Sequence, residues 1–240
     1  MAESSGREHG RAAAHMRPVT LERGVARYAE GSCLVAFGET RVLCTASVEA
    51  GVPSWRKGKA AGWVTGEYSM LPRATHTRGR RERGQVGGRT QEIQRLIGRS
   101  LRACVDMAAM GEWTVTVDCD VLQADGGTRT ASITGGAVAL HDACLWIAGR
   151  TGAPTAFREF VAALSAGVVD GEVLLDLDYS EDSRAEVDFN VVALESGGLI
   201  EMQGTGERAP FTPAQLGALM ELTTAGIRDL CRLQREAVSR

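Results

Sequence analysis

A glycine-rich stretch between an expected strand and an expected helix constrains this chain most. The run 113–122 is rich in β-branched residues and alternates enough to predict a strand. Apolar residues recur at helical spacing over 133–148, and Gly149 stands where a helix C-terminal glycine is expected. The turn between them, with Gly126 and Gly127, would expose backbone N–H groups at a helix N-terminus, which favour a phosphate-sized anion.

Arg129, which follows this glycine pair, adds a planar and permanently charged guanidinium. On these residues alone, a glycine pair followed by Thr-Arg is a tight turn more often than a phosphate site. The local pattern leaves both interpretations open, and the rest of the chain has to decide between them.

The composition is that of a folded protein with a sizeable core. The 240 residues, 44% of them hydrophobic, suffice for one large domain or two closely packed halves. No stretch long enough to span a membrane lacks charge, and the polar start has no secretory apolar run. We therefore expect a soluble, cytoplasmic protein without a membrane partner. The six cysteines form no C-x-x-C pair, which predicts reduced core residues.

Charge is distributed unevenly along the chain. The formal net charge is −3, yet nine arginines face two glutamates between Arg73 and Arg102. The chain has only two lysines, so a genome that prefers arginine codons can explain the residue type. It does not explain the clustering, which predicts a surface that faces a polyanion.

These arginines lie in an expected loop and in the helix after it. Residues 70–88 have no apolar period and many glycines and arginines, which predicts a long loop. From Thr90 an apolar stripe predicts a helix, with Arg95, Arg99 and Arg102 together on another face. Such a row is usually only a solvated helix face. Its position directly after a basic loop makes a nucleic-acid surface the competing interpretation.

The remaining pattern alternates strands with helices. Strands are expected over 32–37, 41–48, 61–68, 160–169, 172–178, 185–194 and 199–204, and a final amphipathic helix over 213–235. Each half offers strands followed by a helix, which is an α+β pattern. We expect a mobile N-terminal arm over 1–16 and one domain over 17–240, built from pseudo-equivalent halves of about 17–150 and 151–240.

The segment 175–190 is dense in carboxylates. A strand from Ala185 would turn Asp188 and Asn190 to one face, where Asp188 could meet Asp182 of the preceding turn. Two carboxylates with phosphate oxygens and waters suit Mg²⁺, and they could also handle a proton in phosphoryl transfer. An acidic, solvated turn is the alternative that spacing alone favours.

Several long motifs, in order along the chain, together resemble the bacterial ribonuclease PH family. They are Gly31-Ser32, 42–48, Met70-Leu71-Pro72-Arg73, 88–99, 123–132 and 181–192. They span nearly the whole chain, and their combination is far more specific than a single glycine turn. One departure stands at the start, where Arg7-Glu8-His9-Gly10-Arg11 has His9 in place of the family's usual Asp. We therefore carry no role over to that arm.

The resemblance implies two β-rich halves with packed helices, similar to domain 2 of ribosomal protein S5, assembled as a homo-hexameric ring that is a trimer of dimers. It assigns phosphate binding to Arg89, Gly127, Thr128 and Arg129. It assigns catalysis and metal binding to Asp182 and Asp188. With the arginine row added, the RNA-binding candidates are Arg73, Arg78, Arg80, Arg81, Arg83, Arg95 and Arg99.

The activity implied by the resemblance is that of a transfer RNA nucleotidyltransferase. It would trim transfer RNA precursors and other structured RNA 3′ ends phosphorolytically, release nucleoside diphosphates and add nucleotides in reverse. Inorganic phosphate would be the co-substrate, and the metal Mg²⁺, with Mn²⁺ as the alternative.

Two other functions stay open. A catalytically silent ring subunit is disfavoured by the joint presence of Arg89, Arg129, Asp182 and Asp188. A small-molecule kinase using Gly126 and Gly127 would leave the basic loop without a substrate.

Overall fold

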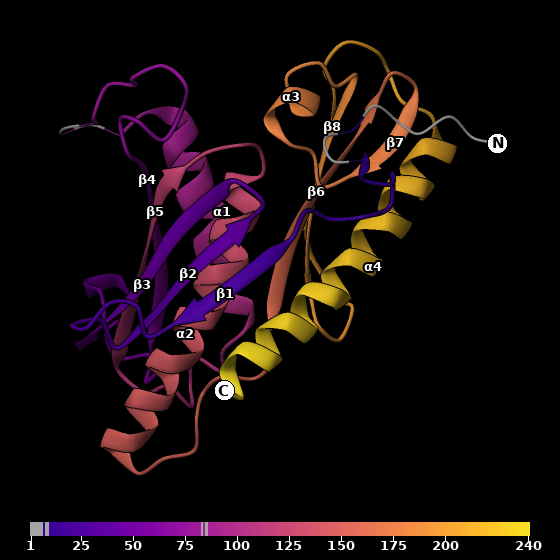
Figure 1. Cartoon of the computed structure of the whole chain (residues 1–240). Helices are drawn as coiled ribbons and strands as arrows, with labels where there is room; N and C mark the ends of the chain where they lie inside the picture. The colour runs from indigo at the N-terminus through magenta and orange to yellow at the C-terminus, as the bar shows by residue number, and fades with distance from the viewer. Residues whose placement is uncertain (1–6, 8–9, 83, 85) are drawn as a thin grey trace.

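Two β-sheets organise the residues that the computed structural model describes, which are 7, 10–82, 84 and 86–240 (Figure 1). The first sheet has the order β1-β2-β3-β5-β4, with β4 parallel to β5 and the other pairs antiparallel. The second has the order β7-β6-β8-β9 and is antiparallel throughout. The expected α+β fold is confirmed.

The elements of the first half run from β1 to α2. They are β1 (Val19–Arg23), β2 (Gly31–Phe37), β3 (Thr40–Ala50), β4 (Trp63–Met70), α1 (Gly88–Ala103), β5 (Trp113–Gln123) and α2 (Thr128–Thr151). A short 3₁₀ turn, Ser54–Arg56, precedes β4. Because β4 and β5 are parallel, α1 serves as the crossover between them. The strand β1 was not expected from the sequence.

The second half contains β6 (Val161–Val169), β7 (Glu172–Leu175), α3 (Tyr179–Asp182), β8 (Val187–Leu194), β9 (Leu199–Gly206) and α4 (Pro213–Val238). In Figure 1 the orange strands of this sheet stand beside the purple strands of the first, and α4, in yellow, runs diagonally along them. Every residue of β6 is buried, because α2 and α4 both pack against this strand. The predicted strand 172–178 ends early, at Leu175, because Asp176 takes a left-handed φ of 53°.

The helix α2 lies between the two sheets and contacts both. It is long and apolar enough to cross a membrane, but 72% of its most apolar window is buried inside the protein, as in a core helix. It starts at Thr128, before the predicted apolar stripe, and the hydroxyls of its polar first turns are satisfied by carbonyls one turn earlier. Thr130 Oγ1 donates to Gly127 O at 2.8 Å, and Thr134 Oγ1 to Thr130 O at 2.9 Å. The terminal glycine is Gly152, at φ 69°, and Gly149 lies within the helix.

The N-terminal segment, expected to be mobile over 1–16, lies against the second half wherever the structure describes it. Arg7 is 6% exposed, and its Nε donates to Glu181 Oε1 at 2.6 Å. Arg11 Nη1 donates to Asp176 O at 2.7 Å. Residues 1–6, 8 and 9, including the unusual His9, lie outside the described part. The contacts of Arg7 and Arg11 bring this segment close to the carboxylate-rich turn.

Candidate active site

A cavity of about 190 Å³ lies where the two halves meet, and both halves line it. From the first half come Arg89 of α1 and the turn that starts α2; from the second come α3 and β8. The structure places all the predicted phosphate and carboxylate residues in its wall: Arg89, Gly127, Thr128, Arg129, Asp182 and Asp188. Side chains far apart in the sequence thus form one site.

The glycine turn has a conformation that only glycines adopt easily. Gly126 and Gly127 have φ values of 77° and 66°, and Gly127 is the N-cap of α2. A Cβ on Gly126 would lie 2.5 Å from Leu177 O and 2.8 Å from Asp178 C, so the turn packs directly on the backbone of the acidic segment. The free N–H groups and positive dipole end of a 24-residue helix therefore face the cavity.

Thr40 fixes this turn from the first sheet. Its Oγ1 donates to Gly126 O at 2.7 Å and accepts from Asp125 N at 2.9 Å. Thr40 is fully buried at the start of β3, so the hydrogen bonds are shielded from water. The turn is therefore held before any ligand binds.

Two arginines supply the positive charge of the cavity. Arg89 is exposed near the start of α1, and Arg129 follows Thr128 at the start of α2. Arg129 Nη1 donates to Gln203 Oε1 at 3.1 Å and lies 3.5 Å from Glu92 Oε1. This orients its guanidinium while 18% of its side chain stays exposed. Together with the helix N-terminus, the two arginines can bind a phosphate dianion.

Neither aromatic residue of β4, Trp63 or Tyr68, presents a free ring face on which an RNA base could stack. Tyr68 is 5% exposed, and its hydroxyl is 2.8 Å from Thr128 Oγ1, so it positions Thr128. The Trp63 ring lies under the guanidinium of Arg102, at 4.5 Å. Tyr179 is a better candidate, because it is 53% exposed and lines the cavity.

Asp182 and Asp188 reach the cavity from α3 and β8. A capping box, in which Asp178 Oδ1 accepts from Glu181 N at 3.0 Å, fixes α3 just before Asp182. Asn190 Nδ2 donates to Asp188 Oδ1 at 3.0 Å. The structure thus aims both carboxylates at the cavity as the strand alternation predicted.

Burial and mutual repulsion perturb these two carboxyls. Partial loss of hydration raises the pKa of Asp182, although the residue is exposed on one side, and the charges of Arg89 and Arg129 oppose the rise. Loss of hydration also raises the pKa of Asp188, and the Asp182 charge adds to it. Two carboxyls that disfavour joint ionisation suit a cation between them, or a proton on one of them.

The carboxylates fit a loosely coordinated metal better than an all-protein site. No group of three or more His, Cys, Asp or Glu side chains that could hold a metal occurs within residues 7, 10–82, 84 and 86–240. Mg²⁺ commonly uses one or two carboxylates and takes its other ligands from water and substrate phosphates. Asp182 and Asp188 in one wall match that pattern.

Sequence reasoning missed Ser165 of β6 as part of the cavity wall. Its Oγ is buried without a hydrogen-bond partner and lies 3.7 Å from where a Gly127 Cβ would stand. The signal was present, since Ser165 is the one polar residue in the strand Val161–Val169. A hydroxyl at that place is available to an added ligand or water.

The arginines predicted to bind RNA lie outside the cavity. Arg73, Arg78, Arg80 and Arg81 are exposed in the loop between β4 and α1, and Arg83 lies outside the described residues. Arg80 and Arg89 line a second cavity of about 250 Å³, so the loop adjoins the site. Arg95, Arg99 and Arg102 share a groove along α1, as the helical spacing predicted. Within it, Arg99 pairs with Glu201, and Arg102 Nη1 donates to Val64 O at 3.0 Å.

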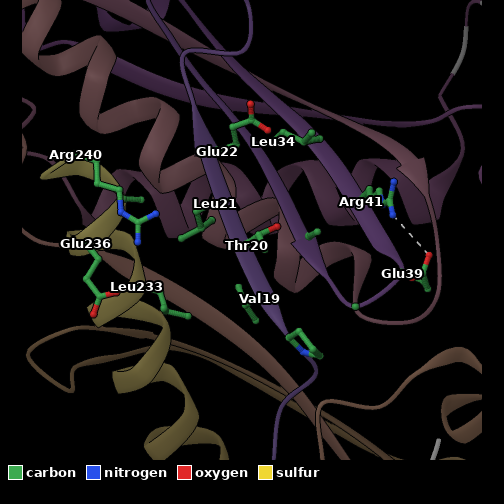
Figure 2. A pocket seen from close by; sticks show the side chains of 14 residues that line it. Val19, Thr20, Leu21, Glu22, Leu34, Glu39, Arg41, Leu233, Glu236 and Arg240 are labelled. Atoms are coloured by element: carbon green, nitrogen blue, oxygen red, sulfur yellow. Dashed lines mark ion pairs between the residues drawn. The ribbon is translucent and has the colours of Figure 1, made fainter. Parts of the chain in front are cut away.

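A larger cavity lies elsewhere and contains none of the predicted site residues. It measures about 780 Å³ and lies between β1, β2 and the end of α4, with Leu34, Leu233 and Arg240 in its wall (Figure 2). Its lining mixes apolar residues with an Arg41–Glu39 ion pair at 3.8 Å. The smaller cavity, with paired arginines and carboxylates, is the one equipped for chemistry.

The chain is similar to known proteins over nearly its whole length. Two family models match, described as the 3′ exoribonuclease family, domain 1 over residues 15–145 and domain 2 over 159–226. Ribonuclease PH of Mycolicibacterium smegmatis is 58% identical over 238 residues, 98% of this chain and 92% of the relative. Ribonuclease PH of Methylorubrum populi is 59% identical over 232 residues, 95% of this chain and 98% of the relative.

Solved structures share the fold at low sequence identity. Rice Rrp46 matches with a TM-score of 0.78 and 22% identity, covering 96% of this chain and 99% of that one. The Archaeoglobus fulgidus exosome with RNA bound to the active site matches with a TM-score of 0.79 and 23% identity, covering 92% and 89%. At this identity the likeness supports the fold.

The raised pKa of Asp188 predicts a stability penalty at neutral pH. The penalty is fully present above the folded-state pKa and disappears as pH falls to the unfolded value, about 3.9. Asp188→Asn should therefore raise the melting temperature at neutral pH, and the gain should shrink toward pH ~4. Asp170→Asn, on an exposed turn, is the charge-matched control. A melting temperature of Asp188→Asn that never exceeds wild type would contradict this account.

Proposed function

This chain belongs to the 3′ exoribonuclease family and is a phosphorolytic 3′-to-5′ exoribonuclease; we propose that the cavity at the junction of its halves carries out the reaction. The observation that supports this site is the convergence of Arg89, Arg129, Asp182 and Asp188 on one cavity. A catalytically silent subunit would have no need of that convergence.

Inorganic phosphate is held by Arg89, Arg129, the Thr128 hydroxyl and the backbone N–H groups at the start of α2. One of its oxygens attacks the phosphorus of the last phosphodiester of RNA, and the bond from that phosphorus to the 3′ oxygen of the preceding nucleotide breaks. The products are a nucleoside diphosphate and an RNA shortened by one nucleotide with a free 3′ hydroxyl. The same contacts serve the reverse reaction, because one phosphorus–oxygen bond is exchanged for another in both directions.

The chain's own groups supply positioning and charge. Arg89 and Arg129 neutralise the attacking phosphate, so that two anions can approach. Phosphate attacks as its dianion and needs no general base. Asp188, whose pKa is raised by burial and by Asp182, is suited to deliver a proton to the departing 3′ oxygen when no cation is bound to it. When bound, Mg²⁺, or Mn²⁺ in its place, would be held by Asp182 and Asp188 and would neutralise charge on the reacting phosphates.

Transfer RNA precursors and other structured RNA 3′ ends are the proposed substrates. The exposed arginines of the loop between β4 and α1 would contact the RNA backbone outside the cavity, together with Arg95 and Arg99. Arg83 is included on sequence grounds alone. We further propose that the enzyme acts in the cytoplasm as a homo-hexamer, a trimer of dimers, which sizing by light scattering would test.

The direct test incubates the protein with a 3′-extended transfer RNA, Mg²⁺ and inorganic phosphate. We expect stepwise shortening only when phosphate is present, with nucleoside diphosphates as the sole small products. Shortening in phosphate-free buffer, or release of nucleoside monophosphates, would overturn the proposal.

Arg129→Ala tests the phosphate contact. Loss of a charge-assisted hydrogen bond should raise the KM for phosphate about tenfold to a hundredfold, with RNA affinity nearly unchanged. Arg158→Ala, an exposed arginine paired with Asp106 and outside the cavity wall, is the control and should leave both constants unchanged. Equal losses of phosphate and RNA affinity in Arg129→Ala would mean that phosphate is not its chief ligand.

Replacing Arg78, Arg80 and Arg81 together by Gln tests the basic loop. Binding of transfer RNA should weaken more than binding of a short oligonucleotide, and its salt dependence should become shallower. A control with Arg150, Arg158 and Arg228 replaced by Gln removes the same charge from exposed sites elsewhere. If the two triple variants behave alike, the weaker binding of transfer RNA reflects the lost net charge, and the loop is not a specific RNA-binding surface.

A further inference from the structure

The geometry points to Arg17 as a positioning residue: with Asp176 it forms a buried clamp that holds the phosphate-binding turn against the segment carrying Asp182. This inference rests on the proposed function, since it concerns the same cavity. The clamp joins the segment before β1 and the turn before α2, in the first half, to the segment between β7 and α3, in the second, and neither clamp residue lines the cavity. Its role is therefore to fix the distance between these segments, while the residues of the cavity wall carry out the chemistry.

The Asp176 end of the clamp is fully occupied. Arg17 Nη2 donates to Asp176 Oδ1 at 2.6 Å, and Arg17 Nε donates to Oδ2 at 2.9 Å, which makes a bidentate pair. The backbone N of Arg17 donates to Oδ2 as well, at 2.8 Å. Asp176 is 0% exposed and has a left-handed φ of 53°. A non-glycine residue in that conformation marks a place where the surroundings dictate the backbone.

The same guanidinium holds the phosphate-binding turn. Arg17 Nη1 donates to Asp125 O, immediately before Gly126. Arg17 Nη2 lies 3.2 Å from where a Cβ on Gly127 would stand, so the guanidinium lies directly against the turn. Asp125 in turn accepts from Tyr179 N at 3.3 Å through Oδ1. One side chain thus touches both the turn that starts α2 and the turn that leads into α3.

The contact with Asp176 explains how Arg17 stays charged although it is buried. Burial works against the charged form of Arg17, and its hydrogen bond and attraction to Asp176 outweigh this and raise its pKa. Apolar replacements of buried ion pairs are often as stable, so stability alone is a weak reason for such a pair. Fixing one geometry is a better reason here, because a shift of about 1 Å at a reacting group can cost about a hundredfold in rate.

Arg7 and Arg11 extend the clamp along the N-terminal segment. Arg7 Nη2 donates to Glu181 Oε2 at 3.0 Å, and Arg11 Nη2 donates to the same oxygen at 3.1 Å. Glu181 directly precedes Asp182 and belongs to the capping box of α3. The N-terminal segment therefore fixes the carboxylate side of the cavity as well as the phosphate side.

Arg17→Lys is the informative variant, because lysine keeps the charge but cannot reach both oxygens of Asp176 and Asp125 O at once. The matched control is Arg23→Lys. Arg23 makes the same bidentate contact with Asp142, at 3.0 and 2.7 Å, and does not line the cavity. Both variants lose one such pair, so both should lower the melting temperature.

Only Arg17→Lys should weaken the binding of phosphate. We expect its KM for phosphate, and its dissociation constant for inorganic phosphate by titration calorimetry, to rise about tenfold to a hundredfold, with KM for RNA within about twofold of wild type. Arg23→Lys should keep wild-type values of all three. If Arg17→Lys lowers the melting temperature as Arg23→Lys does and binds phosphate as wild type, the clamp is merely structural and the inference is wrong.

A second variant guards against a folding defect. Asp176→Asn keeps the shape of the side chain and tolerates a positive φ, so it weakens the clamp without straining the backbone, and a cooperative melting transition would show that the variant is folded. It should repeat the phosphate defect of Arg17→Lys; an unchanged phosphate affinity contradicts the clamp.

Failure of the proposed function would look different: wild type would bind phosphate yet release monophosphates. The clamp would then still be judged by phosphate affinity. A wild-type protein that binds no phosphate would contradict both the proposed function and the clamp.

Discussion

The site depends on a direct contact between two stretches of main chain. Gly126 lies so close to the Leu177–Asp178 backbone that even a methyl group would collide with it. The glycine turn continues into α2, while the acidic segment continues into α3 and β8, so this contact joins the two sheets at the cavity. Thr40 on one side and Arg17 on the other hold the contact in place. The packing of the two halves against each other therefore also brings the residues of the site together.

The cavity separates opposite charges by assigning them to opposite halves. Arg89 and Arg129 begin helices of the first half, where the helix dipole adds to their positive charge. Asp182 and Asp188 come from the second half, and hydration loss there raises the pKa of both. A reaction between two phosphate groups needs positive charge, since each phosphate repels the other, and the two carboxylates would contribute by holding a cation or a proton. The arrangement supplies this by positioning, with little covalent chemistry required of the protein.

Much of the fold and of the site could be predicted from the sequence. Strand and helix periods gave the α+β class, and the motifs containing Arg89, Gly127, Asp182 and Asp188 named residues that the structure brings together. Each miss has a physical cause. The first turns of α2 are polar, with hydroxyls that donate to carbonyls one turn earlier, so an apolar stripe does not reveal them. Nothing in the spacing of Arg7, Arg11 and Arg17 shows that they meet Glu181 and Asp176, far along the chain. Ser165 belongs to the cavity because β6 faces the glycine turn, a tertiary fact.

The central claim is that inorganic phosphate, bound between the two halves, is itself the attacking group. The most direct measurement supplies phosphate labelled with ³²P to the enzyme with unlabelled RNA and locates the label in the products. Attack by the bound phosphate predicts label in the terminal phosphate of the released nucleoside diphosphates and none in the shortened RNA. Release of unlabelled nucleotides would contradict it.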